Sequence, residues 1–262
     1  MLEISNLSKT FNKNTINEKI ALDHINLTLK EGDFVTVIGG NGAGKSTLLN
    51  AICGAWNIDA GKILLDGINI TNMADYKRAK FLGRVFQDPM MGTAGEMEIA
   101  ENLAIANRRG KRRTLRWGMK KQEKATYQTL LAQLDLGLEN RLTSKVGLLS
   151  GGQRQALTLL MATLQKPKLL LLDEHTAALD PKTAAKVLEI TDRIVSEKNL
   201  TTIMITHNMK DAIAHGNRLI MMNEGKIIAD ISGAEKEKLT VEDLLRMFEN
   251  SGTTVNDSAI LA

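Results

Sequence analysis

The feature that most constrains this chain is a glycine-rich loop between an apolar run and a helix-forming run. The loop residues are Gly39, Gly40, Asn41, Gly42, Ala43, Gly44, Lys45, Ser46 and Thr47, which match the pattern G-x-x-x-x-G-K-[ST]. Phe34–Ile38 before the loop is β-branched and apolar, which predicts a buried strand, and Lys45–Ala51 after it predicts a helix. Glycines let backbone N–H groups turn inward around an anion, and a helix N-terminus adds partial positive charge. The sequence therefore predicts a phosphate-binding loop, with a plain glycine-rich turn as the weaker alternative.

The residues that would act on a bound phosphate chain lie in this loop and after a second apolar run. Lys45 has the reach to bind the outer phosphates, and the Ser46 hydroxyl is a ligand for Mg²⁺. Lys168–Leu172 predicts a buried strand, followed by Asp173 and Glu174. Because ligands gather at the carboxyl ends of parallel strands, we expect Asp173 beside Ser46, where it holds Mg²⁺ through water. We expect Glu174 to orient or deprotonate an attacking water; the alternative is a strand end with two solvated acids.

Length and composition allow one large domain with room for an insertion. The chain has 262 residues, of which 43% are hydrophobic, enough for a sizeable core. The single cysteine, Cys53, cannot form an internal disulfide, which favours a reducing, cytosolic compartment. No run approaches the roughly 18 apolar residues of a membrane span, and Met1–Ile4 does not begin a secretory signal. We therefore expect a cytosolic protein, free to dock on a membrane partner.

The order of the predicted elements indicates an α/β fold with a mainly parallel sheet. Strands are expected at Leu2–Leu7, Ala21–Leu29, Phe34–Ile38, Lys62–Gly67, Gly83–Phe86, Lys168–Leu172, Thr201–Thr206, Arg218–Met222 and Lys226–Ile231. Helices are expected at Lys45–Ala51, Glu98–Ile105, Lys121–Leu134, Gly152–Leu164 and Pro181–Lys198. The first strands predict a small antiparallel layer. We expect a single domain over 1–250, with a core of 1–90 and 165–250, a helical insertion at about 91–164, and a frayed tail at 251–262.

A second short motif, Leu149–Gln153, is more discriminating than the strand-end acids. Its residues Ser150, Gly151 and Gly152 begin a predicted helix, and a helix start is a second anion site. The alternative is a surface turn that caps a core helix. One nucleotide needs only one phosphate cradle, so two cradles in one chain require an explanation.

The motifs together resemble the nucleotide-binding subunit of an ATP-binding cassette (ABC) transporter. The resemblance rests on Gly39–Thr47, Leu149–Gln153, Leu169–Glu174 and Ala178–Asp180 in this order, and it extends from Leu2 to about Phe248. It implies a P-loop ATPase with ATP and Mg²⁺ as cofactors. It also implies a head-to-tail dimer with a second copy, in which the signature residues of one chain cap the ATP of the other. Those signature residues are Ser150, Gly151, Gly152 and Gln153.

The resemblance implies roles for four further residues. Phe11 stands where the family has an aromatic residue that stacks on adenine, with a turn or core aromatic as the alternative. Gln87 resembles the glutamine that contacts Mg²⁺ and the attacking water. Asp180 resembles the acid that communicates across the dimer, and His207 resembles the histidine that contacts the γ-phosphate.

Two residues depart from the commonest family pattern. Gly40 replaces a frequent proline, and a glycine there is expected to be harmless. His175 follows Glu174 where small residues or proline are common. We expect His175 to be structural or to make a local polar contact, and we leave it out of the catalytic set.

The resemblance favours the motor of a solute importer at the cytoplasmic face of the cell membrane. Its implied partners are separate integral membrane permease subunits, contacted near Thr93–Glu101, and an extracytoplasmic solute-binding protein. The stretches Leu148–Thr158 and Leu170–Lys182 resemble cassettes for small solutes, with aromatic amino acids as candidates. The alternatives are a split exporter motor and a soluble ABC ATPase of translation or DNA repair. The soluble class is disfavoured because this chain has one cassette and a compact insertion.

A basic run lies inside the predicted helical block. Residues 108–124 carry a net charge of +8, which leaves −4 for the rest of the chain. The cations are Arg108, Arg109, Lys111, Arg112, Arg113, Arg116, Lys120, Lys121 and Lys124, and the one acid is Glu123. A solvated loop and helix face is the leading interpretation. Anionic lipid headgroups are the second, and nucleic acid is disfavoured because Trp117 is the only aromatic residue in the run.

Overall fold

The structure is a computed structural model, and it describes residues 1–111 and 121–250. Its contacts divide the chain into two compact units, which are described separately below. The first unit contains Met1–Arg78 and the segment from Asn199 onward, and the second contains Ala79–Lys198. The predicted division into a core and an insertion at about 91–164 stays a prediction. No helix in the described part of the chain is long and apolar enough to cross a membrane.

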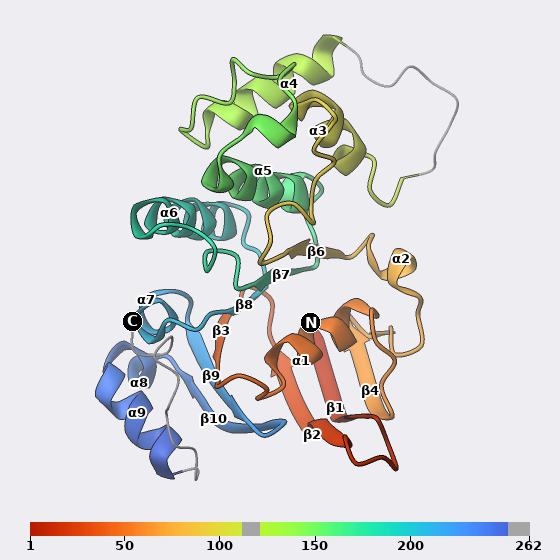
Figure 1. Ribbon diagram of the computed structural model, residues 1–262, viewed down its shortest axis with the longest axis vertical. Helices are drawn as coiled ribbons and strands as arrows, with labels where there is room; N and C mark the ends of the chain where they lie inside the picture. The colour runs from red at the N-terminus through yellow and green to blue at the C-terminus, as the bar shows by residue number, and fades with distance from the viewer. Residues whose placement is uncertain (112–120, 251–262) are drawn as a thin grey trace. The chain divides into compact units, whose positions relative to one another are not determined.

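The first unit contains the expected antiparallel layer. It has four strands in the order β2-β1-β4-β5, namely β1 (Leu2–Phe11), β2 (Lys19–Leu29), β4 (Ala60–Leu65) and β5 (Ile68–Asn69) (Figure 1). Leu2, Ile4 and Leu7 of β1 lie in the core, and a register shift between Ile4 and Leu7 interrupts the alternation of buried and exposed side chains. The strand is longer than predicted because its pairing with β2 continues to Phe11 opposite Lys19.

The same unit contains a mainly parallel sheet in the strand order β10-β9-β3-β8. Its strands are β3 (Phe34–Ile38), β8 (Thr202–Ile205), β9 (Arg218–Asn223) and β10 (Lys226–Ser232). Strand β3 is central and pairs in parallel with both β8 and β9. All five residues of β3 are buried, as its continuous apolar run predicts for a strand covered on both faces.

The helices in the described part of the first unit are short, and several of them were not predicted. They are α1 (Lys45–Cys53), α2 (Asp75–Arg78), α7 (Met209–Ala214), α8 (Ala234–Glu237) and α9 (Val241–Asn250). Leu244 and Phe248 of α9 pack with Met209 of α7 and Leu219 of β9 in one buried cluster. The C-terminal helix therefore completes the core of this unit.

The second unit combines two strands with the predicted helices. Strands β6 (Leu82–Val85) and β7 (Leu169–Asp173) are parallel, with Val85 opposite Leu172. The helices are α3 (Ile99–Asn107), α4 (Lys121–Ala132), α5 (Gly151–Leu164) and α6 (Pro181–Glu197), and a 3₁₀ turn spans Val146–Leu148. Helix α5 packs against α3 and α6 (Figure 1). Ten of its fourteen residues are buried, so α5 is the central helix of this unit.

Candidate functional site

The phosphate loop follows β3 at the carboxyl end of the parallel strands. Gly42 and Gly44 have positive φ angles of 81° and 103°, which side chains rarely adopt. A Cβ atom on Gly39 would lie 2.3 Å from the Met222 carbonyl oxygen. By contrast, a Cβ atom on Gly40 would meet nothing within 4 Å. The tight backbone of the loop therefore depends on three of its glycines, and Gly40 is free of that restriction.

Lys45 is the first residue of α1 and is buried at the base of the loop. Its ammonium group donates hydrogen bonds to the carbonyl oxygens of Gly39 at 2.6 Å and Gly40 at 3.1 Å. Leu48 and Ile52 of the same helix lie in the core. The helix thus holds one cation and a row of backbone N–H groups at the loop, which suits a polyphosphate.

His207 lies at the same edge of the sheet as the loop. It follows β8, which pairs in parallel with β3. The backbone N–H of Thr206 donates to the Val37 carbonyl oxygen at 3.2 Å and ties the two strand ends together. The structure therefore brings together the loop and the predicted γ-phosphate histidine, whose role stays a prediction.

Phe11 ends β1 and contacts an aromatic residue that the sequence analysis did not select. Its ring packs edge-on against Trp56 with the ring centroids 4.9 Å apart, and the Lys9 ammonium lies 5.4 Å from its centroid. Trp56 is 40% exposed. A partly exposed Phe11 ring packed on an exposed Trp56 at a strand end is a suitable platform for a planar base, and adenine stacking on Phe11 remains a prediction.

In the second unit, the predicted metal and water ligands follow two paired strands. Gln87 comes shortly after β6, and Asp173 ends β7. Asp173 accepts a hydrogen bond from the Arg84 guanidinium at 2.9 Å, within an ion pair of two largely buried side chains. Glu174 has a φ of 48°, a left-handed conformation that is uncommon for a residue with a side chain. Such strain often marks functional positions.

A buried glutamine connects the signature helix with the Gln87 segment, and sequence reasoning missed it. Gln155 of α5 is fully buried and donates to the Phe86 carbonyl oxygen at 2.9 Å. Its own amide oxygen has no hydrogen-bond partner among the described residues. A long polar side chain among the mainly apolar residues of this helix is the signal that could have found it.

The signature residues form a capped helix start, as predicted. Ser150 is the N-cap of α5, and it exchanges hydrogen bonds with Gln153 in a capping box. A Cβ atom on Gly152 would lie 2.1 Å from Thr183 of α6, so the two helix starts abut. Asp180 caps α6 by accepting from the Thr183 N–H at 3.1 Å, and its hydrogen bonds with Thr183 lower the pKa of the Asp180 carboxyl.

His175 makes the local polar contact that we expected. It is 2% exposed, and its Nε2 lies 3.0 Å from the Thr191 hydroxyl oxygen of α6. That hydroxyl donates to the Val187 carbonyl oxygen at 2.8 Å, so it accepts from the imidazole N–H. The residue after Glu174 is thereby fixed to α6.

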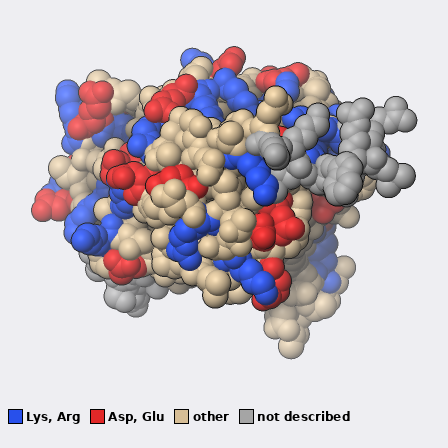
Figure 2. Space-filling view, turned by 90° about the horizontal axis from the view of Figure 1, so that it is seen from above, with Lys and Arg blue, Asp and Glu red and all other residues tan. Residues whose placement is uncertain are grey.

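Two arginines in the described part of the basic run make structural contacts within the second unit. Arg109 donates to the carbonyl oxygens of Ala162 at 2.9 Å and Gln165 at 2.7 Å, where α5 ends, and burial lowers the pKa of its guanidinium. Arg108 pairs with Glu123. The cations between 112 and 120 lie outside the described residues, so the lipid and nucleic-acid hypotheses stay untested. On the face shown in Figure 2, basic and acidic side chains are interspersed.

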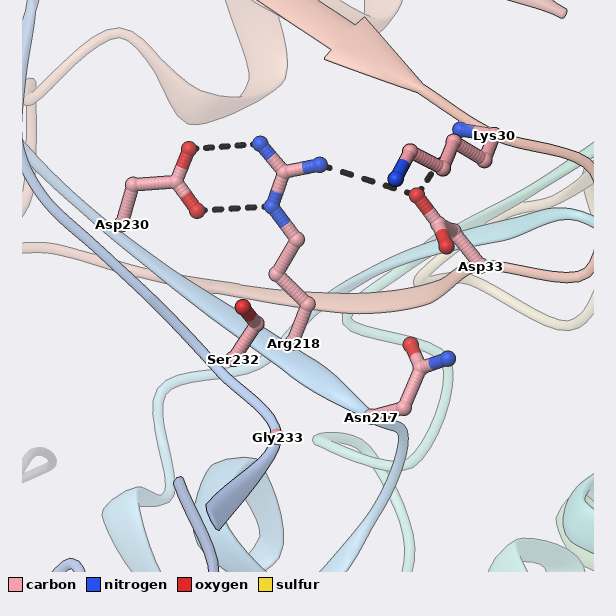
Figure 3. Close-up of a pocket in the computed structure, with 7 residues that line it drawn as sticks. All are labelled: Lys30, Asp33, Asn217, Arg218, Asp230, Ser232 and Gly233. Carbon is pink, nitrogen blue, oxygen red and sulfur yellow. Dashed lines mark hydrogen bonds and ion pairs between the residues drawn. The ribbon is translucent and has the colours of Figure 1, made fainter. Parts of the chain in front are cut away.

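A pocket of ≈ 470 Å³ lies at the opposite, amino end of the parallel strands (Figure 3). Arg218 donates to both carboxylate oxygens of Asp230, at 2.6 and 2.5 Å, and to the Thr28 carbonyl oxygen at 2.7 Å. Asp33 accepts from the Lys30 N–H and lies 3.6 Å from Arg218. These charged groups satisfy one another, and the Asp230 carboxylate raises the pKa of Arg218. We therefore interpret the ion-paired residues that line this pocket as structural contacts that connect neighbouring strands.

The residues available for a metal ion fit Mg²⁺. No group of three or more His, Cys, Asp or Glu side chains in residues 1–111 and 121–250 forms a metal cage. Ser46, Gln87 and Asp173 offer only oxygen ligands, and Ser46 is exposed. Mg²⁺ prefers oxygen ligands and commonly takes one or two carboxylates together with substrate phosphates. The joining of Ser46 with Asp173 and Gln87 stays a prediction, because these residues belong to separate units.

Comparison with known proteins agrees with these features. A family model described as ABC transporter matches residues 22–177. The tyrosine transport ATP-binding protein of Clostridioides difficile (strain R20291) is 49% identical over 254 residues, which are 95% of this chain and 99% of that protein. The spermidine/putrescine import ATP-binding protein PotA of Haemophilus influenzae is 33% identical over 90% of this chain, which spans 59% of that protein.

A solved structure has the same fold. The dimeric post-hydrolysis state of the ATP-binding cassette MJ0796, bound to ADP and Pi, aligns with a TM-score of 0.76. It is 28% identical, and the alignment covers 88% of this chain and 98% of that one. The predicted fold class of an ABC ATPase is therefore confirmed.

Proposed function

This chain belongs to the ABC transporter family as an ATP-binding subunit that hydrolyses ATP, and we propose that it drives the uptake of an aromatic amino acid. The observation that carries this proposal is the 49% identity with a tyrosine transport ATP-binding protein over almost the full length of both chains. The import function of PotA supports the direction of transport. A split exporter motor is the competing function within the same family.

In the proposed reaction, the loop holds ATP and residues at the carboxyl ends of parallel strands act on its γ-phosphate. Lys45 and the N–H groups of α1 bind the phosphate oxygens. Glu174 orients and deprotonates the attacking water, and His207 donates a hydrogen bond to the γ-phosphate. Ser46, Asp173 (through water) and Gln87 would hold Mg²⁺, which neutralises charge on the transferred phosphoryl group. Arg84 orients the Asp173 carboxylate.

The second anion site is assigned to the ATP of another copy. Ser150 and Gly151 are exposed at the start of α5, and Gly152 behind them is buried. In a head-to-tail dimer, this helix start caps the γ-phosphate bound by the partner's loop, and Asp180 lies next to it at the start of α6. The dimeric cassette among the structural relatives supports this arrangement.

The segment after Gln87 is the proposed contact for the permease. The Gly147 N–H donates to the Gly95 carbonyl oxygen at 2.8 Å, which joins this segment to the turn before the signature. Large apolar side chains are exposed here, with Met90 at 59%, Met91 at 68% and Leu148 at 72%. Exposed apolar side chains that form one patch mark interaction sites, and we propose that these three form such a patch. They fit an amphipathic helix of a membrane subunit, which would hold the chain at the cytoplasmic face.

Substitution of Glu174 by glutamine tests the catalytic assignment. We expect Glu174→Gln to bind ATP as the wild type does, because the amide has nearly the same size as the carboxylate. Hydrolysis should fall by about 10²–10⁴-fold, because the amide cannot accept the proton. The measurements are steady-state phosphate release and ATP affinity by calorimetry. Glu197→Gln, at an exposed position of α6, is the matched control, and near-normal turnover of Glu174→Gln would refute the role.

A further inference from the structure

A lysine outside every motif lies against the phosphate loop. A Cβ atom on Gly42 would be only 2.7 Å from the Lys19 Nζ, so the ammonium group sits directly beside the loop backbone. Lys19 is exposed and has no hydrogen bond or ion pair among the described residues. An unpaired cation at an anion-binding loop has a full charge available for a ligand.

The strands place Lys19 there by close backbone contact. Lys19 is the first residue of β2 and lies opposite Phe11 in the β1–β2 ladder. Two residues further along β2, the Ala21 carbonyl oxygen would lie 2.4 Å from a Cβ atom on Gly44. The β2 backbone therefore runs against the phosphate loop, and only glycine allows this approach.

The charged residues near Lys19 make their own contacts and leave its ammonium group available for a ligand. The Glu18 carboxylate accepts from the Asn14 N–H at 2.7 Å within the β1–β2 turn. The second loop cation, Lys45, is directed at the loop carbonyl oxygens of Gly39 and Gly40. The two lysines thus approach the loop from different elements.

We infer that Lys19 binds the phosphate chain of the nucleotide, at the end nearer the base. This inference rests on the proposed function, because it requires ATP in the phosphate loop. Phe11, opposite Lys19, is the predicted adenine platform, and Gly42 is in the phosphate cradle. An ammonium group between them reaches the phosphate next to the ribose. A charge-assisted hydrogen bond to phosphate is roughly twice as strong as a neutral one.

The test compares Lys19→Gln with Lys13→Gln in the full chain. Both remove one positive charge from the same hairpin, but the Lys13 ammonium is paired with Asp59 at 3.2 Å. We expect Lys19→Gln to weaken binding of ATP, ADP and AMP by a similar factor of about 5–30. It should also reduce the salt dependence of ATP affinity, while Lys19→Arg retains most of the affinity and Lys13→Gln binds as the wild type does. Calorimetry gives the affinities, and thermal melts check folding.

Three outcomes would overturn the inference. Unchanged nucleotide affinity in Lys19→Gln is the first, and equal weakening in Lys13→Gln is the second, since it would indicate a general effect of charge. A loss confined to ATP, with ADP and AMP unaffected, is the third, because it would move the contact to the γ-phosphate. A wild-type chain that binds no ATP would overturn the proposed function as well, whereas normal wild-type binding beside an unchanged Lys19→Gln would overturn the inference alone.

Discussion

At the scale of single residues, the phosphate loop shows how close backbone contacts restrict sequence. Gly39 and Gly40 are neighbours and look equivalent in the motif. The space around them differs, because the Met222 carbonyl oxygen of β9 presses on Gly39 and nothing approaches Gly40. The fold therefore requires glycine at one position and only permits it at the other.

Alanine substitutions at these two glycines should have different effects on stability. Gly39→Ala forces a methyl group against the Met222 carbonyl oxygen, so the free energy of unfolding should fall by about 1–3 kcal/mol. Gly40→Ala should change it by less than about 0.5 kcal/mol. Urea denaturation followed by circular dichroism measures both free energies of unfolding. Equal losses of stability in the two variants would show that the close contact at Gly39 does not restrict which residue fits there.

At the scale of elements, several helix ends are closed by one long side chain from elsewhere. Arg78 is the main example, because its guanidinium donates to the Ala51 and Ile52 carbonyl oxygens at the end of α1, at 2.7 and 2.9 Å. It also donates to the carbonyl oxygens of Thr71 and Met73. Arg78 is 3% exposed. The helix that begins with Lys45 is thus anchored at its far end by a buried cation.

Removing the Arg78 guanidinium should destabilise the whole of helix α1. Arg78→Met keeps much of the side-chain volume but leaves buried carbonyl oxygens without donors, so we expect a loss of about 2–4 kcal/mol in the free energy of unfolding. Hydrogen exchange of the α1 amides should become faster. Lys77→Met, an exposed neighbour in α2, is the control and should stay near the wild type. Unchanged exchange in Arg78→Met would contradict the anchoring role.

At the scale of the whole molecule, the proposed dimer divides each ATP site between two chains. Lys45 and Asp173 would act on ATP bound by their own chain, while Ser150 would act on ATP bound by the partner. Inactive variants of the two kinds should therefore rescue each other when mixed, since one of the two sites in a mixed dimer carries both defects and the other carries none.

Mixing experiments test this division. Lys45→Ala and Ser150→Arg should each be inactive alone. Their mixture should recover on the order of a quarter of the wild-type ATP hydrolysis in a single turnover, because about half of the dimers are mixed and each mixed dimer has one intact site of two. Lys45→Ala mixed with Asp173→Ala is the matched control and should recover nothing, because each chain then carries its own defective site. Equal recovery in both mixtures, or recovery only in the control, would contradict the trans arrangement.

Much of the fold could be predicted because its signals are local. Phe34–Ile38 is a strand with the predicted bounds, since a continuous β-branched run between turn residues has few other structures. The capping box of Ser150 and Gln153 likewise lies within four residues. The helices α7, α8 and α9 were not predicted. They are short or polar on average, so they depend on tertiary packing. Helices α7 and α9 pack with β9 in one cluster, and α8 contacts β10.

The sequence by itself determined that this chain binds a phosphate chain, because the motif from Gly39 to Thr47 and its strand and helix are one continuous local unit. Only the tertiary structure decided which residues, distant in the sequence, contact one another within each unit. Lys19 beside Gly42, Arg84 beside Asp173 and Gln155 beside Phe86 come together through strand register and helix packing. Spacing along the chain carries no record of such contacts, since a shift of one residue in a β ladder turns each side chain to the other face.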